Sequence, residues 1–283
     1  MHLASVRTHS GELPAVVLPG RGVALVHDVM PPFSGDILAL LKAEALDDLR
    51  GAADAASDDV FRSPDDVTIG APYRHPRMLL GIGLNYVEHA KDLAEGVPEE
   101  PASFIKGDHT VIGPGEDIPI PWQSARTTAE AELGVVIGRY CRNVEPEGAL
   151  SCVAGVCPVL DQTAEDILER NPRFLTRAKN FPGFFSFGPE IVPLQEAIDA
   201  AGSLADVEVS TVINGSVHRS NTVYHMRYDP AFLISFHSKV MPLFPGDIIS
   251  TGTPGAVHIK PGDVVECRIP GVGTLRNPVV AGE

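Results

Sequence analysis

The chain has 283 residues, of which 44% are hydrophobic and 21% are charged, so it can bury a large core and is too apolar for a disordered protein. Lys and Arg number 22 against 37 Asp and Glu, and the resulting formal charge of −15 repels phosphate backbones, so we expect no nucleic-acid partner. No apolar run approaches the ~18 residues that cross a bilayer, and the first residues lack a secretory signal, so we expect no membrane partner and a cytoplasmic location.

The N-terminal region is predicted to be a small α/β unit. Residues 2–29 alternate short apolar runs with turns, which is typical of a β-meander. Residues 37–56 carry apolar side chains at helical spacing and predict one helix. Residues 57–76 are polar and interrupted by prolines, as in a linker. We therefore expect a domain boundary near residue 72, with a small N-terminal α/β domain over 1–72 and a larger domain over 73–283.

The remainder of the chain is predicted to be mainly β-strands. Asn214-Gly215 stands between apolar flanks, which is the strongest hairpin signal in the chain. Pro230 opens a helix that runs to about Val240. Strands do not alternate with long helices, so the fold class is mainly β with a few helices (α+β). The clearest predicted strands are 78–84, 130–137, 153–160, 207–213 and 264–269.

Two carboxylates enter the apolar strand at residues 130–137. Alternation places Glu130 and Glu132 on one face and only apolar side chains on the other. Neighbouring carboxylates resist burial unless a positive charge lies between them, and carboxylate oxygens suit Mg²⁺, Mn²⁺ or Ca²⁺. A solvated strand edge with two charges is an equally good interpretation of this stretch alone.

A third carboxylate favours the metal interpretation. Asp161 ends the apolar run 153–161, so a second buried strand delivers an acid at its C-terminal end. Asp161 could equally cap the turn that follows it. Three acids from two buried strands nevertheless make a coherent site of three oxygens, which leaves positions for water and substrate.

Further segments are candidates for catalysis or binding. His89 and Asp92 stand three residues apart, so one helical turn would pair the imidazole with a carboxylate as a general base, although a surface pair is the commoner outcome. Lys179 lies beside an apolar Phe-Pro-Gly-Phe-Phe run, with an exposed lysine as the alternative. Residues 246–254 end a strand in a turn rich in hydroxyls, which is either a plain β-turn or a set of donors for a carboxylate.

Other chemistries find no support in the sequence. The four cysteines match no zinc pattern and are expected to be structural. Gly81 and Gly83 lack the third glycine of a dinucleotide-binding loop, and neither a P-loop nor a nucleophile elbow is present. We therefore expect no organic cofactor.

Roughly residues 77–280 contain an ordered set of short motifs. The set is Asn85-Tyr-x-x-His89, Phe104-Ile-Lys106, Glu130-x-Glu132-Leu, Val136-Ile-Gly138, Asp161-x-Thr-Ala, Ala178-Lys-x-Phe181, Asn214-Gly215, Thr251-Gly-Thr-Pro254 and Gly273-Thr-Leu-Arg-Asn277. No single motif is specific, but the ordered set resembles the fumarylacetoacetate hydrolase family. The resemblance implies a mixed β-sandwich roll with a smaller N-terminal part, usually as a homodimer.

The resemblance also implies the members of an active site. It assigns Mg²⁺ or Mn²⁺ (Ca²⁺ is possible in crystals) to the three carboxylates described above. It assigns the general base to His89, paired with an acid at Asp92, and the role of electrophilic lysine to Lys179. Thr253 is expected to contact the carboxylate of the substrate, and Lys106 is also expected among the substrate-binding residues.

Three departures from the family pattern bear on the substrate. The family usually has Glu at the position of Asp92, which is one methylene shorter. It commonly has Arg where this chain has Glu165, a further expected substrate-binding residue, and a negative charge there should disfavour a substrate with a second carboxylate. A Gln often found one turn later is Leu168 here, which makes the expected pocket more apolar.

The leading functional prediction is hydrolysis of a carbon–carbon bond in an acylpyruvate or related β-diketo acid. The metal would stabilise the enolate, His89 and Asp92 would activate water, and Lys179 would stabilise the oxyanion. The alternatives are an oxo-acid decarboxylase, isomerase or hydratase on the same metal. A catalytically silent ligand-binding member of the fold is a further alternative. In each case the expected partner is a small oxo acid.

Overall fold

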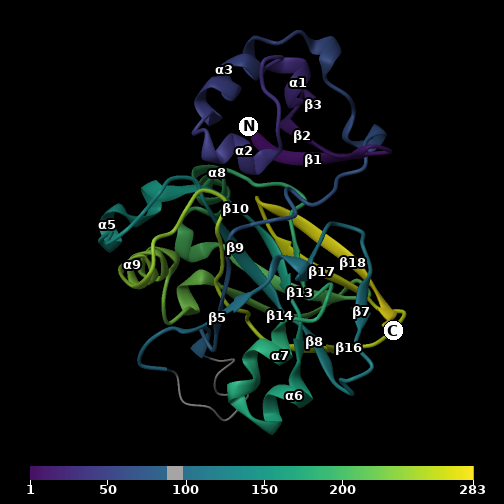
Figure 1. Ribbon diagram of the computed structural model, residues 1–283, viewed down its shortest axis with the longest axis vertical. Coiled ribbons are helices and arrows are strands. Elements are labelled where there is room, and N and C mark those ends of the chain that lie inside the picture. Colours follow the sequence, from purple (N-terminus) through teal and green to yellow (C-terminus); the bar gives the residue numbers. More distant parts are fainter. Residues whose placement is uncertain (88–97, 283) are drawn as a thin grey trace.

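A computed structural model of the protein describes residues 1–87 and 98–282, and its fold is mainly β with helices at the edges (Figure 1). The predicted fold class is confirmed. The strands are β1 (His2–Thr8), β2 (Gly11–Leu18), β3 (Gly22–Leu25), β4 (Leu79–Gly83), β5 (Ala102–Lys106), β6 (Val111–Ile112), β7 (Ile118–Ile120), β8 (Thr127–Ala129), β9 (Ala131–Ile137), β10 (Val153–Asp161), β11 (Thr163–Ala164), β12 (Phe185–Phe187), β13 (Glu208–Ile213), β14 (Ser216–Thr222), β15 (Ile248–Ser250), β16 (Val257–Ile259), β17 (Val264–Ile269) and β18 (Gly273–Ala281). The α-helices are α1 (Val26–Val29), α2 (Ile37–Lys42), α3 (Leu46–Ala55), α5 (Pro146–Ala149), α6 (Glu165–Arg170), α7 (Leu175–Lys179), α8 (Leu194–Ala201) and α9 (Pro230–Val240).

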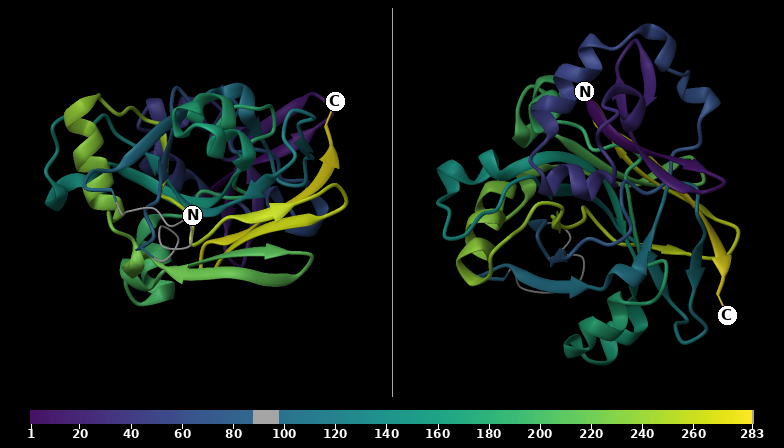
Figure 2. Two further views of the ribbon diagram at one scale, coloured as in Figure 1. Left: turned by 90° about the horizontal axis from the view of Figure 1, so that it is seen from below. Right: turned by 45° about the horizontal axis from the view of Figure 1, so that its top comes forward.

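The described strands pair into sheets of three, seven, three and five strands. The orders are β1-β2-β3, β5-β4-β15-β9-β10-β12-β6, β11-β8-β16 and β14-β13-β17-β18-β7. In the seven-stranded sheet the antiparallel pair β9–β10 is central, and β15 flanks β9 on its other side. In Figure 2 the β17–β18 pair extends along one side of the molecule as a long antiparallel ribbon.

Strand β9 is buried on both faces. Its residues Leu133, Val135 and Ile137 belong to the core between the seven-stranded and five-stranded sheets. Val136 points the other way and belongs to a second core, which includes apolar residues of α2 and α3. The N-terminal helices therefore pack against the outer face of the seven-stranded sheet.

Helix prediction in the N-terminal region is corrected by the structure. The single helix expected over 37–56 is two helices, α2 and α3, and the expected strand beyond Gly22 turns into the short helix α1 at Val26. Helix α2 ends because Glu44 adopts a left-handed φ of 52°. The amide of Ala45 donates to Leu40 O at 3.2 Å and that of Glu44 donates to Leu41 O at 3.1 Å, which is a Schellman motif. Glutamate is an unusual residue at that position, so the sequence pattern gave no stop signal.

Two local predictions in the larger part of the chain are confirmed. Asn214 and Gly215 join β13 to β14 with φ values of 51° and 83°, as a two-residue turn of the primed type requires. Helix α9 begins at Pro230, and the Asp229 side chain accepts a hydrogen bond from the amide of Phe232 at 2.8 Å. None of the helices in the described part of the chain is long and apolar enough for a membrane-crossing segment.

The first residues of the chain form polar contacts with the larger part of the protein. The ring nitrogens of His2 lie 2.6 Å from Glu190 Oε2 and 2.7 Å from Glu196 Oε2, and the N-terminal ammonium of Met1 lies 3.2 Å from Glu196 Oε1. Backbone hydrogen bonds also join Leu3 to Ile191 in both directions. Burial opposes protonation of His2, but the two carboxylates outweigh burial and raise its pKa above the ordinary value of 6.5.

The His2 contacts predict a pH-dependent contribution to stability. Because the pKa is raised in the folded state, the contribution is complete below about pH 6.5 and is lost as the pH rises through the folded-state value. We expect His2→Gln to lower the free energy of unfolding by up to about 1 kcal/mol near pH 6 and to have little effect near pH 9. Urea unfolding at both pH values measures this, with His9→Gln, at an exposed histidine, as the control. A difference that grows with rising pH would contradict the assignment.

Candidate metal centre

Three carboxylates converge at one end of the β9–β10 pair. The antiparallel register places Ala131 opposite Leu160, and the amide of Asp161 donates to Glu130 O at 2.9 Å, so the acids at the end of each strand are neighbours. One ligand oxygen from each of Glu130, Glu132 and Asp161 lies within 4.8 Å of the other two. The structure thus brings together the three acids that the sequence predicted as metal ligands.

All three acids are buried, with exposed fractions of 9% for Glu130, 1% for Glu132 and 0% for Asp161. The alternative of a solvated strand edge is therefore wrong. Thr128 and Thr163 donate their hydroxyls to Glu130 Oε1 at 3.1 and 2.6 Å. These hydrogen bonds fix the orientation of the carboxylate, as outer partners of metal ligands commonly do.

Glu132 is oriented by the last residue of β15 and by the turn that follows it. Ser250 Oγ and the amide of Gly252 donate to Glu132 Oε2 at 2.5 and 2.8 Å. Gly252 has a φ of 100°, and a Cβ there would lie 2.8 Å from the Asn85 Cβ, so a glycine is required for this contact. The turn does supply donors for a carboxylate, and that carboxylate belongs to the protein itself.

Two buried lysines pair with two of the three acids, Glu130 and Asp161. Lys179 Nζ lies 2.9 Å from Glu130 Oε2 and 3.1 Å from Asp161 Oδ2, and its exposed fraction is 5%. Lys106 Nζ donates to Asp161 Oδ1 and also to the carbonyl oxygens of Gln162 and Phe184, at 3.2 and 2.5 Å. Both Asp161 oxygens therefore contact an ammonium group, and the alternative of an exposed Lys179 is wrong.

The pKa values in this cluster depend on burial and on the charged groups around each side chain. Burial lowers the pKa of Lys106 to about 8, and repulsion by Lys179 adds to this, because the opposing effects of Asp161 and Glu130 do not outweigh them. Burial also disfavours the charged form of Lys179, but Asp161, Glu130 and Glu132 outweigh it and raise its pKa. Burial raises the pKa of Glu132, and the negative charge of Asp161 adds to that effect. Lys179 is therefore the fixed positive charge of the site.

The donor set fits a hard divalent cation. Three carboxylates with ligand oxygens this close together, and with outer hydroxyl and amide donors on two of them, match the oxygen preference of Mg²⁺ and Mn²⁺. A cation and Lys179 would use the same two carboxylates, Glu130 and Asp161. The site could thus hold a metal with a cationic amine directly beside it.

The other expected substrate residues lie around this centre. Thr253 is 4% exposed, and its hydroxyl donates to Gly255 O at 3.2 Å, within the turn that also supplies the Gly252 amide. Lys106 is 2% exposed and its ammonium lies on Asp161 and main-chain carbonyls rather than facing solvent. His89 and Asp92 lie outside the described residues.

Glu165 contacts Arg126, which directly precedes β8, and His258 of β16. Its Oε2 lies 2.6 Å from His258 Nε2 and 2.7 Å from Arg126 Nε, and Arg126 also pairs with Glu169. The sequence argument that Glu165 repels a second substrate carboxylate is therefore weakened, because the guanidinium of Arg126 offsets part of its charge. Leu168, the other departure, packs against a small apolar cluster that includes Ala178, the neighbour of Lys179.

Several residues of the site were not found from the sequence. Thr163 lay within a quoted motif, and Ser250 lay within the hydroxyl-rich turn, but neither was assigned a role. Thr128 precedes the first acid by two residues, so its hydroxyl was a detectable donor. No sequence pattern around Arg126 or His258 indicated a contact with Glu165, because only the pairing of β8 with β11 and β16 brings these residues together.

Comparison with known proteins agrees with this geometry. Residues 78–280 match the family model for the C-terminal region of fumarylacetoacetate (FAA) hydrolase. Oxaloacetate tautomerase fahd2 of Xenopus laevis is 32% identical over 245 residues, which cover 83% of this chain and 75% of that protein.

Two solved structures cover 100% of this chain and 100% of their own chains. The 5-carboxymethyl-2-hydroxymuconate delta-isomerase of Mycobacterium smegmatis is 29% identical with a TM-score of 0.78. The maleylpyruvate hydrolase of Sphingobium sp. SYK-6, solved with manganese(II) and pyruvate, is 27% identical with a TM-score of 0.82. These relatives include a tautomerase, an isomerase and a hydrolase.

Proposed function

This chain belongs to the fumarylacetoacetate hydrolase family, and from that premise we propose that it is a metal-dependent hydrolase of an acylpyruvate or a related β-diketo acid. The observation that carries the proposal is the buried group Glu130, Glu132 and Asp161, whose oxygens lie within 4.8 Å of one another beside a lysine. The reaction consumes one water, breaks the bond between the pyruvate part and the acyl carbonyl carbon, and yields a carboxylic acid and pyruvate.

The three carboxylates would hold Mg²⁺ or Mn²⁺. When bound, the cation would orient the oxo-carboxylate end of the substrate and stabilise the negative charge that develops there. The manganese and pyruvate in the maleylpyruvate hydrolase structure support this choice of metal and ligand. No organic cofactor is needed for such a reaction.

Each remaining residue has a specific role in the proposal. Lys179, kept protonated by the acids, would donate a hydrogen bond to the oxyanion that forms when water attacks the acyl carbonyl. Lys106 would act as a positioning residue, because its ammonium holds the Asp161 oxygen that Lys179 does not contact. Thr253 would donate its hydroxyl to the carboxylate of the substrate.

The direct test is cleavage of acetylpyruvate in the presence of Mn²⁺, for the wild type and for Glu132→Gln. Changes in the outer partners of metal ligands cost about 10–100-fold in metal affinity, so loss of a ligand charge should weaken Mn²⁺ binding by at least about 100-fold. We expect cleavage to fall in parallel, and added Mn²⁺ to restore part of it. Glu208→Gln, in a strand of the five-stranded sheet, is the control. Full Mn²⁺ binding by Glu132→Gln would contradict the proposed metal site.

The general base is proposed to be His89, paired with Asp92. Loss of a well-placed general base costs about 10²–10⁴-fold in rate. We therefore expect His89→Ala to reduce acetylpyruvate turnover by that factor while Mn²⁺ affinity stays within twofold or so of the wild type. Turnover and metal titration of the same preparation measure the two effects separately. Unchanged turnover would remove His89 from the mechanism.

Oxaloacetate tautomerisation is the second candidate function. It is favoured by the similarity to the Xenopus laevis oxaloacetate tautomerase and by the ion pair of Glu165 with Arg126, which weakens the charge argument against a dicarboxylate. Such a reaction moves a proton without an attacking water. Parallel assays of acetylpyruvate cleavage and oxaloacetate keto–enol exchange separate the two. Exchange without cleavage would replace the hydrolase proposal.

Assembly and location belong to the same proposal. We expect a homodimer, which light scattering coupled to gel filtration measures directly. We also expect a cytoplasmic enzyme.

The division of the chain near residue 72 likewise remains a prediction, and expression of residues 73–283 alone would test whether that part folds independently.

A further inference from the structure

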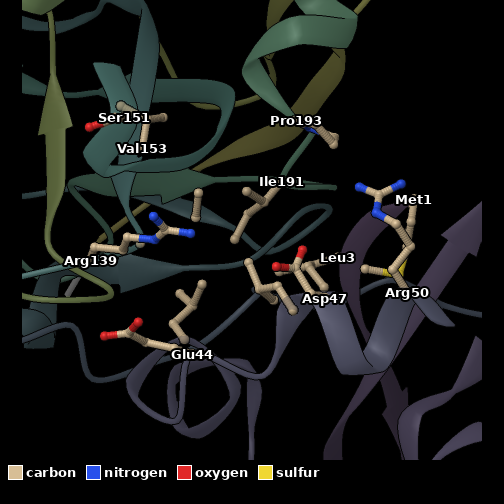
Figure 3. A pocket seen from close by; sticks show the side chains of 14 residues that line it. Met1, Leu3, Glu44, Asp47, Arg50, Arg139, Ser151, Val153, Ile191 and Pro193 are labelled. Atoms are coloured by element: carbon tan, nitrogen blue, oxygen red, sulfur yellow. The ribbon is translucent and has the colours of Figure 1, made fainter. Parts of the chain in front are cut away.

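A cavity of about 390 Å³ lies between the N-terminal helices and the larger part of the protein (Figure 3). Leu3 and Ile191, which line it, are 4% and 2% exposed and offer almost no surface to a ligand. Val153 also lines it and begins β10, whereas the candidate metal ligand Asp161 ends that strand. The cavity is therefore separate from the candidate metal centre, and the groups that can act on a substrate lie instead around Lys179.

An aromatic ring faces the Lys179 ammonium beside the metal centre. Lys179 Nζ lies over the ring of Phe104, 4.8 Å from the ring centroid. This distance is within the ~6 Å over which the negative face of an aromatic ring attracts a cation. Phe104 and Lys106 are two residues apart in β5, so both side chains project from the same face of the strand. That face therefore presents an ammonium group to Asp161 and an aromatic ring to Lys179.

The main chain next to Lys179 is fixed to the same strand. The side chain of Asn180 accepts a hydrogen bond from the amide of Gly107 at 2.7 Å and donates one to Ile105 O at 3.3 Å. These two bonds hold the end of α7 against β5 on both sides of Lys106. The position of the Lys179 ammonium therefore depends on its own side chain and on the groups that its Nζ meets.

The Phe104 ring does not belong to the apolar core. The hydrophobic clusters within residues 1–87 and 98–282 do not include Phe104, which is only partly buried. Gly81 of β4 pairs with Phe104 and leaves room for its ring. A Cβ at Gly81 would lie 2.2 Å from Cζ of the Phe104 ring, so a larger residue would displace the ring. The missing side chain at Gly81 thus allows the ring to lie where it meets Lys179.

A bound cation would leave the ring as a remaining contact of Lys179. Lys179 Nζ also lies 2.9 Å from Glu130 Oε2 and 3.1 Å from Asp161 Oδ2, and both acids are candidate metal ligands. A cation would compete for these oxygens, but a hydrocarbon ring is not a ligand for Mg²⁺ or Mn²⁺. The ring also has no formal charge, so it would hold the ammonium without neutralising it.

We propose that Phe104 is a positioning residue for Lys179, whose ammonium its ring holds beside the metal centre while a cation occupies Glu130 and Asp161. The ring keeps the ammonium available for the oxyanion that forms at the acyl carbonyl. This role rests on the proposed hydrolase function, in which Lys179 donates to that oxyanion. The contact itself does not require the reaction, so it can be tested without substrate.

The contact is tested by NMR of the full-length protein labelled with ¹³C-lysine, in EDTA and in saturating Mg²⁺. The chain has six lysines, and the signal missing from Lys179→Met identifies Lys179. Nuclei above the face of an aromatic ring are shifted upfield, so we expect an upfield signal for the Lys179 Cε protons in both conditions. Phe104→Leu should remove the shift. Its disappearance when Mg²⁺ is added to the wild type would overturn the proposal.

The effect on turnover is tested by weakening the ring face without changing its shape. Replacement of Phe104 by 4-fluoro-, 3,5-difluoro- and 3,4,5-trifluorophenylalanine withdraws electron density from the ring in three steps. We expect kcat for acetylpyruvate to fall at each step and by about 3–30-fold in total, the range of a desolvated cation–π contact. KM should stay within about twofold, because Lys179 acts in the transition state. Trifluorophenylalanine at Phe187, whose ring packs against Tyr73, is the control and should leave kcat unchanged.

A second pair of variants moves the ring without altering its chemistry. Gly81→Ala places a methyl group where the tip of the Phe104 ring lies, so kcat should fall and the upfield shift should change. Gly83→Ala, in the same strand, meets only Ala102 O among the described residues, at 3.6 Å, and should change neither quantity. Circular dichroism checks that both variants are folded.

The results separate this role of Phe104 from the proposed function. Acetylpyruvate cleavage that is insensitive to fluorination of Phe104 would overturn the positioning role and leave the hydrolase proposal intact. Absence of cleavage by the wild type would instead contradict the hydrolase proposal. In that case the Lys179 signal in Mg²⁺ would still decide whether the ring holds the ammonium.

Discussion

Replacing Lys106 by methionine is expected to lower the free energy of unfolding by about 3–5 kcal/mol, the usual cost of removing one partner of a buried ion pair. Lys106 and Asp161 have side-chain exposures of 1% and 0%, so water cannot solvate the carboxylate that loses its partner. Methionine fills a similar volume, so the loss reports mainly on the missing charge and hydrogen bonds. Chemical unfolding of the metal-free protein measures the change.

Two comparisons make the Lys106 result specific. Lys239→Met removes an exposed lysine from its pair with Glu145 and should cost at most about 1 kcal/mol. The double variant Lys106→Met with Asp161→Asn should be less destabilised than the sum of the two single variants, because the buried charge is removed together with its partner. A cost below about 1 kcal/mol for Lys106→Met would mean that Lys179, on the other oxygen of Asp161, suffices to compensate the buried charge.

Replacing Lys179 by methionine is expected to separate metal binding from turnover. Lys179 Nζ contacts Glu130 and Asp161, so its removal takes away a positive charge that a bound cation would meet. Mn²⁺ affinity should therefore be at least as high as in the wild type. Acetylpyruvate turnover at saturating Mn²⁺ should fall by about 10²–10³-fold, the typical cost of losing one donor to an oxyanion.

The control for Lys179 lies on the same helix. Arg177→Met removes a cation from the exposed face of α7 and should change neither quantity. Turnover is normalised to folded, metal-loaded protein, since loss of a buried lysine also affects stability. A Lys179→Met protein that no longer binds Mn²⁺ would show that the lysine serves mainly to keep the three carboxylates together.

The two lysines also offset the cost of burying Glu130 and Asp161. Taking carboxylates out of water is costly unless positive charge and hydrogen bonds replace the lost solvent. Lys106 lies on one oxygen of Asp161, while Lys179 lies between Asp161 and Glu130. A cation that binds there must compete with Lys179 for these oxygens, which would leave the lysine free to donate to a ligand.

Much of this site could be predicted from the sequence because it depends on local patterns. Alternation along 131–137 placed Glu132 opposite the apolar face, and Asp161 could be assigned to the end of its strand because an apolar run stops there. The turn at Asn214-Gly215 was predicted for the same reason: two adjacent residues with positive φ suffice to set it. In each case neighbours in sequence impose the geometry.

Other features were decided only by the tertiary structure. Lys106 and Lys179 are 55 and 18 residues from Asp161, and no local pattern indicates that both ammonium groups meet one carboxylate. The ion pair between Glu165 and Arg126 likewise depends on which strands pair with one another. The sequence by itself determined which residues are acidic, apolar or able to turn. Only the packing of distant segments decided which charges are buried together, because the free energy of a buried charge depends on its neighbours in space rather than in sequence.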